Sequence, residues 1–528
     1  MLDRATREAS DLDGLKALLS DGKLVTDAAE LDYFAHDYFN RGPEPEAVFQ
    51  PGNIEELARV VAAATGKGLA IYPRGGGFSY TDGYLLTKPG ISIDMRSMDR
   101  VVEINEEDMY VTVEAGCTWA KLDEALAPRG LRTPFWGPMS GRNATVGGGA
   151  SQGAVSFGSA KYGISADTII GMSVVTVDGR IIQTGSAGQP HHSPFFRNYG
   201  PDLTGLFLGD CGALGIKARV SLKLIKRPKS VLGLSFGFAD YESYFKASAL
   251  VAREGLATES IGTLAETVEE RASSEGILGG LKALGKVIST SPSLGKGLAS
   301  AARMAFAGAS FAKDHQLLHH LVVEGHEDAM VNSQARRIRE VVGTLGDEIA
   351  NTVPTMIRAD PFPAYDMLSL TGQRQLPPSV ILPHSKVLDF HKDLEKRIAA
   401  RKNKMEALGV EVVPVFATIG TGGFLYEIVM MWDDSVDEFH RRHTNPDLIA
   451  KVEHRDPAPE SRQLAHDLRS DLIEAGYLFG GVHVQIGKVY PYTRERDGEA
   501  LSLLETFKQE LDPAGLCNPG ALGLAVPE

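Results

Sequence analysis

The sequence predicts an α+β protein of two or more domains. Its 528 residues, 43% of them apolar, exceed the length over which a single hydrophobic core keeps growing. An amphipathic segment at 53–66, with the polar cap Asn53 and the stop Gly66, has the spacing of a helix. Short apolar runs such as 69–72 and 110–114 have the pattern of strands. This mixture of helices and short strands indicates the α+β class.

A domain boundary is predicted near Pro228–Ser230, which divides the chain into segments 1–229, 230–455 and 456–528. The first segment has its core at about 44–228. Strand-like runs at 232–238, 410–416 and 424–432 and a helix at 241–254 predict a separate sheet-and-helix domain in the middle segment. The last segment reads as two helices, at 464–475 and 501–511.

Charge and cysteine usage exclude several classes of function. The net charge of −14 argues against a nucleic-acid partner, because phosphate binding needs a cationic surface. Cys117, Cys211 and Cys517 are widely spaced, which argues against a cysteine zinc or iron–sulfur site and favours a reducing compartment. The charged N-terminus lacks the apolar core of a signal peptide, and no apolar run reaches membrane-spanning length. We therefore expect a cytoplasmic protein.

The most informative motif is a glycine-rich turn after the predicted strand at 69–72. Pro73 and Arg74 lead into the three consecutive glycines 75–77, whose missing Cβ atoms allow backbone N–H groups to converge on an anion. A second glycine-rich segment lies at 137–150. Together the two segments predict a phosphate-binding cradle.

The ordered set of motifs resembles the flavoprotein family of vanillyl alcohol oxidase and p-cresol methylhydroxylase, which also contains D-lactate and glycolate dehydrogenases. The resemblance is carried by the Pro-Arg-Gly-Gly-Gly loop at 73–77, Thr-Val-Gly-Gly at 145–148, Tyr-Gly at 162–163, a Val-rich strand ending at Asp178-Gly179, and Leu-Asp-Pro…Asn-Pro-Gly at 511–520. It spans most of the chain.

The resemblance implies FAD as cofactor and a two-domain p-cresol methylhydroxylase-type fold. The FAD domain would be discontinuous, formed by 1–229 and by the C-terminal return 456–528, with 230–455 as the substrate or cap domain. The residues implied to bind FAD are Arg74, Gly75, Gly76, Gly77, Phe78, Ser79, Pro138, Thr145, Gly147, Gly148, Ser151, Gly158, Ile216 and Asn518.

Noncovalent FAD is predicted from the same glycine loop. The berberine-type branch of the family carries its flavin-linking histidine where this chain has Phe78. A link through the second domain stays open as an alternative, with Tyr426, His440 and His443 as the candidates, and we expect the two histidines on a solvated helix face.

The catalytic residues of two subfamilies are missing. Metal-dependent 2-hydroxy-acid dehydrogenases carry a histidine- and aspartate-containing block where this chain reads Ala-Thr-Ile-Gly-Thr-Gly-Gly-Phe-Leu-Tyr at 417–426. Phenol oxidisers hold a phenolate with two tyrosines and an arginine, of which Tyr80 matches the first, whereas Gly480-Gly481 replaces the Tyr-Arg pair. We expect no metal and an incomplete phenolate clamp.

His483 is the candidate catalytic base, with Tyr80 opposite it. In the run 480–488, His483 and Gln485 have period two and would share one face of a strand that lines the substrate site. A second histidine pair, His315 and His319, has the spacing of zinc ligands on a predicted helix, but no third ligand is evident.

The leading hypothesis is a FAD-dependent oxidase or dehydrogenase that acts on an alcohol or benzylic carbon of an apolar or aromatic small molecule. The alternatives are a metal-independent 2-hydroxy-acid dehydrogenase, with Lys488, Arg494 and Arg496 for the substrate carboxylate, and a catalytically inactive flavin-carrying binding protein. Oxygen or an electron carrier would reoxidise the flavin. A homodimer stays open, as does contact of the acid-free, lysine-punctuated segment 276–313 with a membrane or a carrier.

Overall fold

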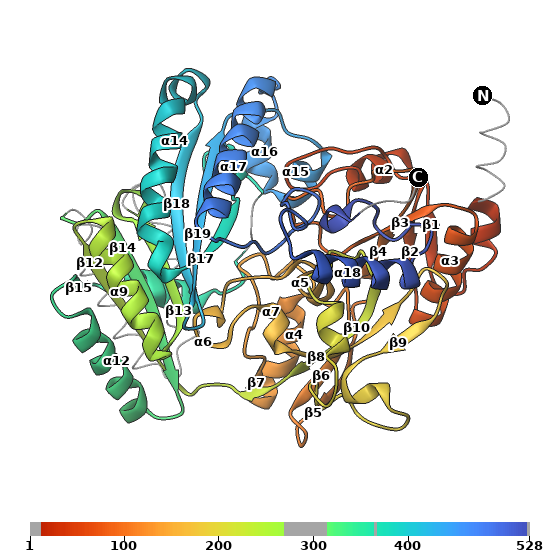
Figure 1. The fold of residues 1–528 in the computed structure, drawn as a ribbon, viewed down its shortest axis with the longest axis horizontal. Coiled ribbons are helices and arrows are strands. Elements are labelled where there is room, and N and C mark those ends of the chain that lie inside the picture. The colour runs from red at the N-terminus through yellow and green to blue at the C-terminus, as the bar shows by residue number, and fades with distance from the viewer. Residues whose placement is uncertain (1–11, 269–313, 364–366, 525–528) are drawn as a thin grey trace.

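A computed structural model describes residues 12–268, 314–363 and 367–524 (Figure 1). The predicted α+β fold is confirmed: three larger units of sheet are surrounded by helices. The acid-free segment 276–313 lies outside the described residues.

Two sheets form the N-terminal half of the fold. The first has the order β1 (Lys23–Val25), β2 (Ala47–Gln50), β4 (Gly90–Asp94) and β3 (Ala70–Arg74), and the second has the order β5 (Val101–Asn105), β6 (Tyr110–Glu114), β10 (Ile216–Lys223), β8 (Ile169–Val175) and β9 (Ile181–Gln183). β7 (Leu131–Arg132) pairs with β11 (Ile225–Lys226) beside them. The strands predicted at 69–72 and 110–114 are therefore present.

The helices of this half include the one predicted at 53–66. They are α2 (Ala28–Phe34), α3 (Ile54–Gly66), α4 (Trp119–Leu126), α5 (Val146–Gln152), α6 (Ser159–Tyr162), α7 (Ser165–Thr168) and α8 (Leu203–Leu206). α3 begins after Asn53, whose side-chain oxygen accepts a hydrogen bond from the backbone N–H of Glu56 at 2.9 Å. Its apolar face, with Leu57 and Val61, packs on the first sheet against Ile71 and shares one core with it.

The middle segment builds a large antiparallel sheet, which we call the cap sheet. Its order is β15 (Asp347–Ile349), β12 (Ser230–Phe238), β14 (Leu317–Gly325), β13 (Ala257–Leu264), β18 (Glu411–Ile419), β19 (Gly423–Trp432) and β16 (Arg374–Leu376), with β17 (Ser379–Pro383) also paired to β19. Its helices are α9 (Tyr241–Glu254), α12 (Asp328–Val342), α13 (Thr352–Ala359), α14 (Val387–Leu408), α15 (Glu438–His443) and α16 (Pro446–Val452).

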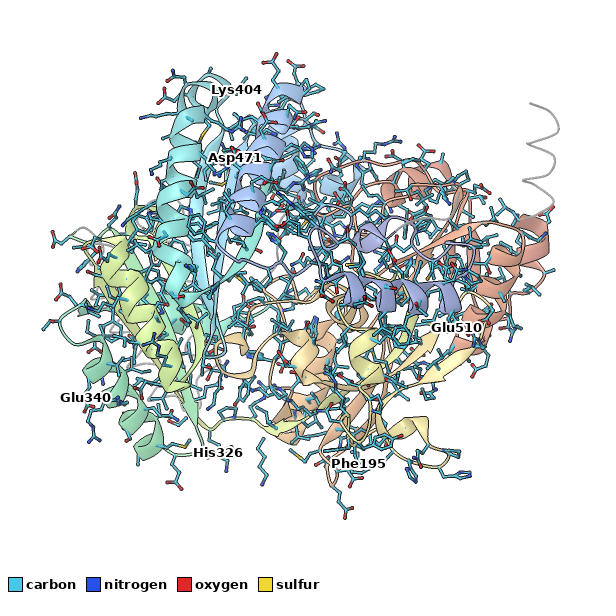
Figure 2. All side chains as sticks on the ribbon, in the orientation of Figure 1. Phe195, His326, Glu340, Lys404, Asp471 and Glu510 are labelled. Carbon is cyan, nitrogen blue, oxygen red and sulfur yellow. The ribbon has the colours of Figure 1, made fainter. Side chains whose placement is uncertain are left out.

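The C-terminal segment first covers the cap sheet and then returns to the N-terminal half, so its start belongs with the cap and not with the predicted return at 456–528. α17 (Pro459–Leu478) packs beside α14 on the outside of the cap sheet, where Lys404 and Asp471 are labelled in Figure 2. α18 (Gly498–Leu511) then leads back to β3, where the N–H of Asn518 donates to the carbonyl of Ile71 at 2.9 Å. None of the described helices is both long and apolar enough to span a membrane.

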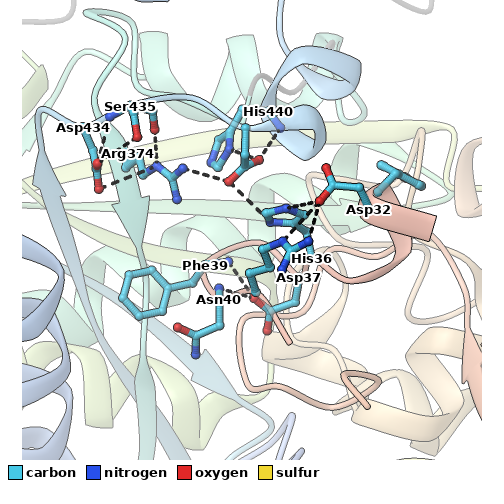
Figure 3. Close-up of polar contacts among 12 residues, drawn as sticks. Asp32, His36, Asp37, Phe39, Asn40, Arg374, Asp434, Ser435 and His440 are labelled. Atoms are coloured by element: carbon cyan, nitrogen blue, oxygen red, sulfur yellow. Dashed lines mark hydrogen bonds and ion pairs between the residues drawn. The ribbon is translucent and has the colours of Figure 1, made fainter. Parts of the chain in front are cut away.

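A network of buried charges joins the segment after α2 to the cap sheet (Figure 3). Asp437, at the start of α15, accepts a hydrogen bond from Arg374 of β16 at 2.8 Å and lies 2.6 Å from Nδ1 of His440. His36 Nδ1 lies 3.5 Å from the same carboxylate. Burial opposes ionisation, but the hydrogen bond with His440 and the charge of Arg374 outweigh it and hold the pKa of Asp437 well below its usual range. We call these four residues the Asp437 latch.

A second group of buried charges joins the two halves elsewhere. Arg132 of β7 donates to Glu324 of β14 at 2.5 Å, and Arg358 of α13 contacts the same carboxylate. The guanidinium of Arg358 also lies over the ring of Trp136, 4.4 Å from its centroid. The cap sheet is thus anchored by buried polar contacts at two separate places, with an ion pair across the halves at the second.

Candidate functional site

The first cavity lies between the turn after β3 and the segment that leads into α5. Twelve of the fourteen residues predicted to bind FAD line it: Arg74, Gly75, Gly76, Gly77, Phe78, Ser79, Pro138, Thr145, Gly147, Gly148, Ser151 and Ile216. The two glycine-rich segments, separated by about 60 positions in the sequence, therefore form one cradle.

The three glycines are required by close backbone approach. A Cβ on Gly76 would meet the carbonyl of Asn143, and one on Gly75 would meet the side chain of Thr145. Gly77 has a φ of +81°, in the left-handed region that favours glycine. From the sequence, these glycines were predicted to make room for an anion. In the structure they also allow the two glycine-rich segments that form the cradle to contact each other.

Arg74 supplies a cation at the cradle. Arg74 is 2% exposed, and its guanidinium stacks over the rings of Tyr33 and Phe34. The guanidinium carbon Cζ lies 4.5 Å from the ring centroid of Tyr33 and 4.7 Å from that of Phe34. Nη1 donates to the carbonyl of Tyr33 at 3.1 Å, whereas Nη2 has no hydrogen-bond partner among the described residues. An unpaired, buried guanidinium N–H beside a Cβ-free turn fits a pyrophosphate, so the residues present fit FAD.

Gly158 and Asn518 do not line the cradle. A Cβ on Gly158, at the start of α6, would meet the carbonyl of Pro134, so this glycine is needed for packing. Asn518 donates through Nδ2 to the carbonyls of Gly83 and Cys211, both at 2.6 Å, and holds the C-terminal return in place.

Several lining residues were not predicted. They include Trp119, Gln152, Gly153, Cys211, Lys217 and Gln485. Gln152 and Gly153 directly follow the second glycine-rich segment, and that proximity was the available signal. The charge of Lys217 is neutralised by an ion pair with Asp210. No local sequence pattern predicts this pair.

A second cavity adjoins the first and shares Gln152 and Gly153 with it. His483 and Tyr490 line it, together with Tyr477, Tyr492, Arg494 and Arg496. The candidate base and the three aromatic rings come from α17 and the segment after it, whereas Gln152 and Gly153 belong to the cradle. This cavity is therefore the candidate substrate site.

The orientation of His483 leaves one ring nitrogen free to accept a proton. Its Nδ1 lies 2.8 Å from the carbonyl oxygen of Ser379, which can only accept, so Nδ1 carries the hydrogen. Nε2 is then an acceptor without a hydrogen-bond partner among the described residues. The ring stacks on Tyr490 with centroids 4.1 Å apart, and burial lowers the pKa of His483. A neutral, oriented imidazole is what a general base requires.

The prediction of a strand at 480–488 is wrong, because the structure has no strand over these residues. Val482 makes one isolated bridge to Ile381 of β17, with N–H to carbonyl distances of 2.8 and 2.9 Å, and the chain then leaves the cap sheet. Gln485 has a φ of +56° and donates its N–H to Gln152 at 2.6 Å. His483 and Gln485 therefore do not share a face: Gln485 lines the first cavity and His483 the second.

Residues 482–488, which we call the strap, are bonded to both halves of the fold. Beyond Gln485, Gly487 N–H donates to Sγ of Cys211 at 3.1 Å, and Lys488 N–H donates to the carbonyl of Thr81 at 2.8 Å. The Lys488 ammonium donates to Asn518 at 3.0 Å and lines neither cavity. Lys488 is thus a structural residue in this arrangement.

The structure does not bring Tyr80 to His483. Tyr80 is 7% exposed, packs in an aromatic core with Tyr38 at 6.3 Å between ring centroids, and lines neither cavity. Its carbonyl accepts a hydrogen bond from Arg469 of α17 at 3.1 Å. A direct role for Tyr80 in the chemistry stays a prediction.

The three candidates for a covalent flavin link lie in different places. Tyr426 bonds His391 at 2.8 Å inside the cap, and His440 is buried in the Asp437 latch. His443 bonds Tyr33 at 2.8 Å, with its ring 5.2 Å from that of Phe78, a cradle residue. The expectation of a solvated helix face was therefore wrong for both histidines, because α15 packs against α2.

The proposed zinc-like spacing of His315 and His319 has no helical basis. His319 lies in β14, fully buried, and bonds the hydroxyl of Ser260 at 2.8 Å. Burial lowers the pKa of His319 to about 3. Within residues 12–268, 314–363 and 367–524, no three His, Cys, Asp or Glu side chains gather as metal ligands would.

Comparison with known proteins matches residues 45–185 to the FAD binding domain. The chain is 32% identical over 186 residues to glycolate oxidase subunit GlcD of Bacillus subtilis, which covers 35% of this chain and 38% of that protein. It is 25% identical over 521 residues to the mitochondrial D-lactate dehydrogenase [cytochrome] of Arabidopsis thaliana, covering 96% of this chain and 79% of that protein.

The fold matches solved flavoprotein structures over almost its full length. With p-cresol methylhydroxylase with substrate bound, the TM-score is 0.71 at 16% identity, covering 98% of this chain and 97% of the other. The match to the Bacillus protein, in contrast, spans well under half of that relative. Residues 45–185 therefore match an FAD-binding domain, and the chain as a whole has the fold of p-cresol methylhydroxylase.

Proposed function

We propose that this protein is a FAD-dependent oxidoreductase that oxidises the CH–OH or benzylic carbon of an apolar or aromatic small molecule. Bound FAD supplies a ring that accepts hydride. The cradle residues, with Arg74 and the 75–77 glycines, would hold the pyrophosphate. The observation that carries the proposal is the shared wall at Gln152 and Gly153, which puts the cavity of His483 next to the FAD cradle.

His483 is the proposed general base. As hydride leaves the substrate carbon, the hydroxyl proton passes to Nε2, the nitrogen that the Ser379 hydrogen bond leaves free. Tyr490 keeps the ring in position by stacking and by accepting the N–H of Ser379 at 3.2 Å. The neutral state of His483, favoured by burial, is the one that can take up this proton.

A metal-independent 2-hydroxy-acid dehydrogenase is the second candidate. Arg494 and Arg496 line the His483 cavity, and cations there suit a carboxylate. The glycolate oxidase subunit and the D-lactate dehydrogenase among the relatives support this reading. Against it, Arg494 is already paired with Glu474 at 2.5 Å, and Arg496 lies over the ring of Tyr492, 3.8 Å from its centroid.

Oxygen or an electron carrier is the proposed oxidant, and the assembly is proposed to be a monomer or a homodimer. The three cysteines are free and buried, which supports the cytoplasmic, reducing location expected from the sequence. Oxygen uptake during turnover, compared with reduction of a dye acceptor, separates the two oxidants.

Anaerobic reduction of the bound flavin by a panel of alcohols tests the proposal. The panel contains benzyl alcohol, 4-hydroxybenzyl alcohol, D-lactate and glycolate. Bleaching of the flavin by an aromatic alcohol supports the leading function, and bleaching only by the hydroxy acids supports the second. A flavin that no member reduces would instead indicate an inactive flavin-carrying protein.

A further inference from the structure

The two faces of strand β19 have different surroundings. Phe424, Tyr426 and Ile428 are buried in the core that the cap sheet forms with Phe390 of α14 and Leu472 of α17. Side chains alternate along a strand, so Glu427 and its neighbours Leu425 and Val429 point to the opposite face. All three are only partly buried.

That opposite face is turned toward the FAD-binding half. α6 of that half packs against β13 and β18 of the cap sheet, and the carbonyl of Ser159 accepts the N–H of Gly420, in the β18–β19 turn, at 2.9 Å. α14 and α17 cover the other side. Glu427 therefore stands on the side of the cap sheet where the flavin cradle and its neighbouring cavity lie.

Glu427 is a carboxyl group without a protein partner. It makes no hydrogen bond or ion pair with any described residue. Its cross-strand neighbours are Val415 on β18 and Ser379 on β17, and no lysine or arginine occupies the inward positions of β17, β18 or β19. Its side chain is only partly buried and its neighbour Val415 is apolar, so the carboxyl group is free to bind a ligand.

Ser379 links Glu427 to the candidate base. Its carbonyl accepts the hydrogen of His483, and its N–H donates to the hydroxyl of Tyr490. Glu427 is the residue of β19 that pairs with Ser379 across the two strands. Its charge contributes to the raised pKa of Tyr490. The proposed base and the unpaired carboxyl group are thus held by the same short strand.

Glu427 is not among the residues that line the two cavities described above, but it stands on the cap face beside them. We propose that it approaches the substrate from the cap side and, in its protonated form, donates a hydrogen bond to the reacting oxygen of a neutral, mainly apolar alcohol. The inference rests on the proposed function. The hydroxyl proton goes to Nε2 of His483 and the hydride to the flavin, while Glu427 keeps its own proton and stabilises the negative charge that develops on oxygen.

The ionisation behaviour of the residue agrees with this role. Burial raises the pKa of Glu427 to about 8, so the carboxyl group keeps its proton at neutral pH. The titratable and charged groups linked to it are Tyr490, on which its charge acts together with that of Arg469 of α17, and His483, which stacks on Tyr490. None of them forms an ion pair with Glu427.

The same geometry selects the class of substrate. Val415, Leu425 and Val429 surround Glu427 with apolar surface, which suits a hydrocarbon or aromatic body. A substrate carboxylate on this face would meet a carboxyl group, and the two arginines of the His483 cavity already contact Glu474 and Tyr492, so 2-hydroxy acids are disfavoured. Glu427 therefore favours the neutral alcohol over the hydroxy acid of the second candidate.

Three variants test the proposal: Glu427→Gln, Glu427→Leu and, as a matched control on the same hairpin, Glu411→Gln. Flavin reduction by the fastest alcohol of the panel is followed by anaerobic stopped flow from pH 6 to 10. The wild type and Glu411→Gln are expected to slow above pH about 8. Glu427→Gln keeps a donor and loses this alkaline decline, whereas Glu427→Leu slows reduction by about 10²–10³-fold.

Infrared spectroscopy of the resting enzyme gives an independent readout. Burial also raises the pKa values of Asp37 and Glu259 to about 7, so their protonated-acid bands are expected in both proteins. The carbonyl band of Glu427, which is lost only above pH about 8, is expected in the wild type and absent from Glu427→Gln. Identical spectra for these two proteins, or an alkaline decline that persists in Glu427→Gln, would overturn the assignment. Failure of every alcohol to reduce the flavin contradicts the proposed function instead, and the infrared titration separates that case.

Discussion

At the scale of single residues, the free Nε2 of His483 makes the sharpest prediction. Replacement of His483 by Ala removes the proton acceptor and is expected to slow anaerobic flavin reduction by about 10²–10⁴-fold, with FAD still bound. Stopped-flow reduction at saturating substrate isolates this step from reoxidation.

Two comparisons give this prediction its control. His454→Ala changes an exposed histidine and leaves the rate unchanged. Tyr80→Phe is expected to cost far less than His483→Ala, because the structure buries Tyr80 away from both cavities. An unchanged reduction rate in His483→Ala would mean that the base lies elsewhere.

Gly76 carries the second prediction at this scale. A valine there collides with the backbone of Asn143 and forces the two walls of the cradle apart, so the purified variant should be colourless. Gly66→Val, at the end of α3, adds its side chain where no atom lies within 4 Å and should remain yellow. Absorbance of the flavin per mole of folded protein decides between the outcomes, and a yellow Gly76→Val would count against the cradle.

At the scale of elements, the Asp437 latch predicts how stability depends on pH. The pKa of Asp437 is held below its unfolded value, so its stabilisation is present above pH about 4 and is lost as pH falls further. Burial lowers the pKa values of His36 and His440, so below pH about 6.5 the unfolded chain binds protons that the folded protein does not. Both effects make the free energy of unfolding decrease from neutral to acidic pH.

Asp437→Asn tests the latch directly. At pH 7 the variant removes the closer of the two carboxylates beside the buried Arg374, whereas Asp434 remains at 3.8 Å. It is expected to lose about 1.5–3 kcal/mol of unfolding free energy, measured by denaturant titration. Asp433→Asn, an exposed acid nearby, is the control and should change little. Equal stability of the two variants would show that the latch does not hold the halves together.

The sequence predicted regular elements well and long-range contacts poorly. α3, β3 and β6 appear where periodicity and caps put them, because their signals are local. The segment around His319 looked helical from spacing alone, yet it pairs with β12 and β13. The strand prediction for the strap was wrong for a related reason. The bend of the strap is set by hydrogen bonds to Thr81, Gln152 and Cys211, which are distant in the sequence and leave no local pattern.

At the scale of the whole molecule, FAD is expected to be noncovalent. Phe78 occupies the position of a flavin-linking histidine, and of the other candidates only His443 lies beside a cradle residue. Acid precipitation should therefore release the yellow colour into the supernatant. Colour that stays with the protein pellet would contradict this, and its loss in His443→Ala would identify the link.

The protein is also expected to work without a metal ion. The prediction rests on the family resemblance, which implies that Ile419, Thr421 and Phe424 stand where metal-binding members carry ligands. Exhaustive chelation should leave the rate of flavin reduction unchanged. A loss of activity that zinc or manganese restores would refute it.

The strap limits how far the two halves can separate. Val482 is bonded to the cap sheet and Gln485 to the cradle, so only three residue steps join them. Fully extended, these steps reach about 10 Å, which is the widest gap that the chain permits at this edge while both sets of hydrogen bonds hold. The two halves therefore cannot open widely at this edge, and His483, the residue after Val482, stays close to the cradle throughout.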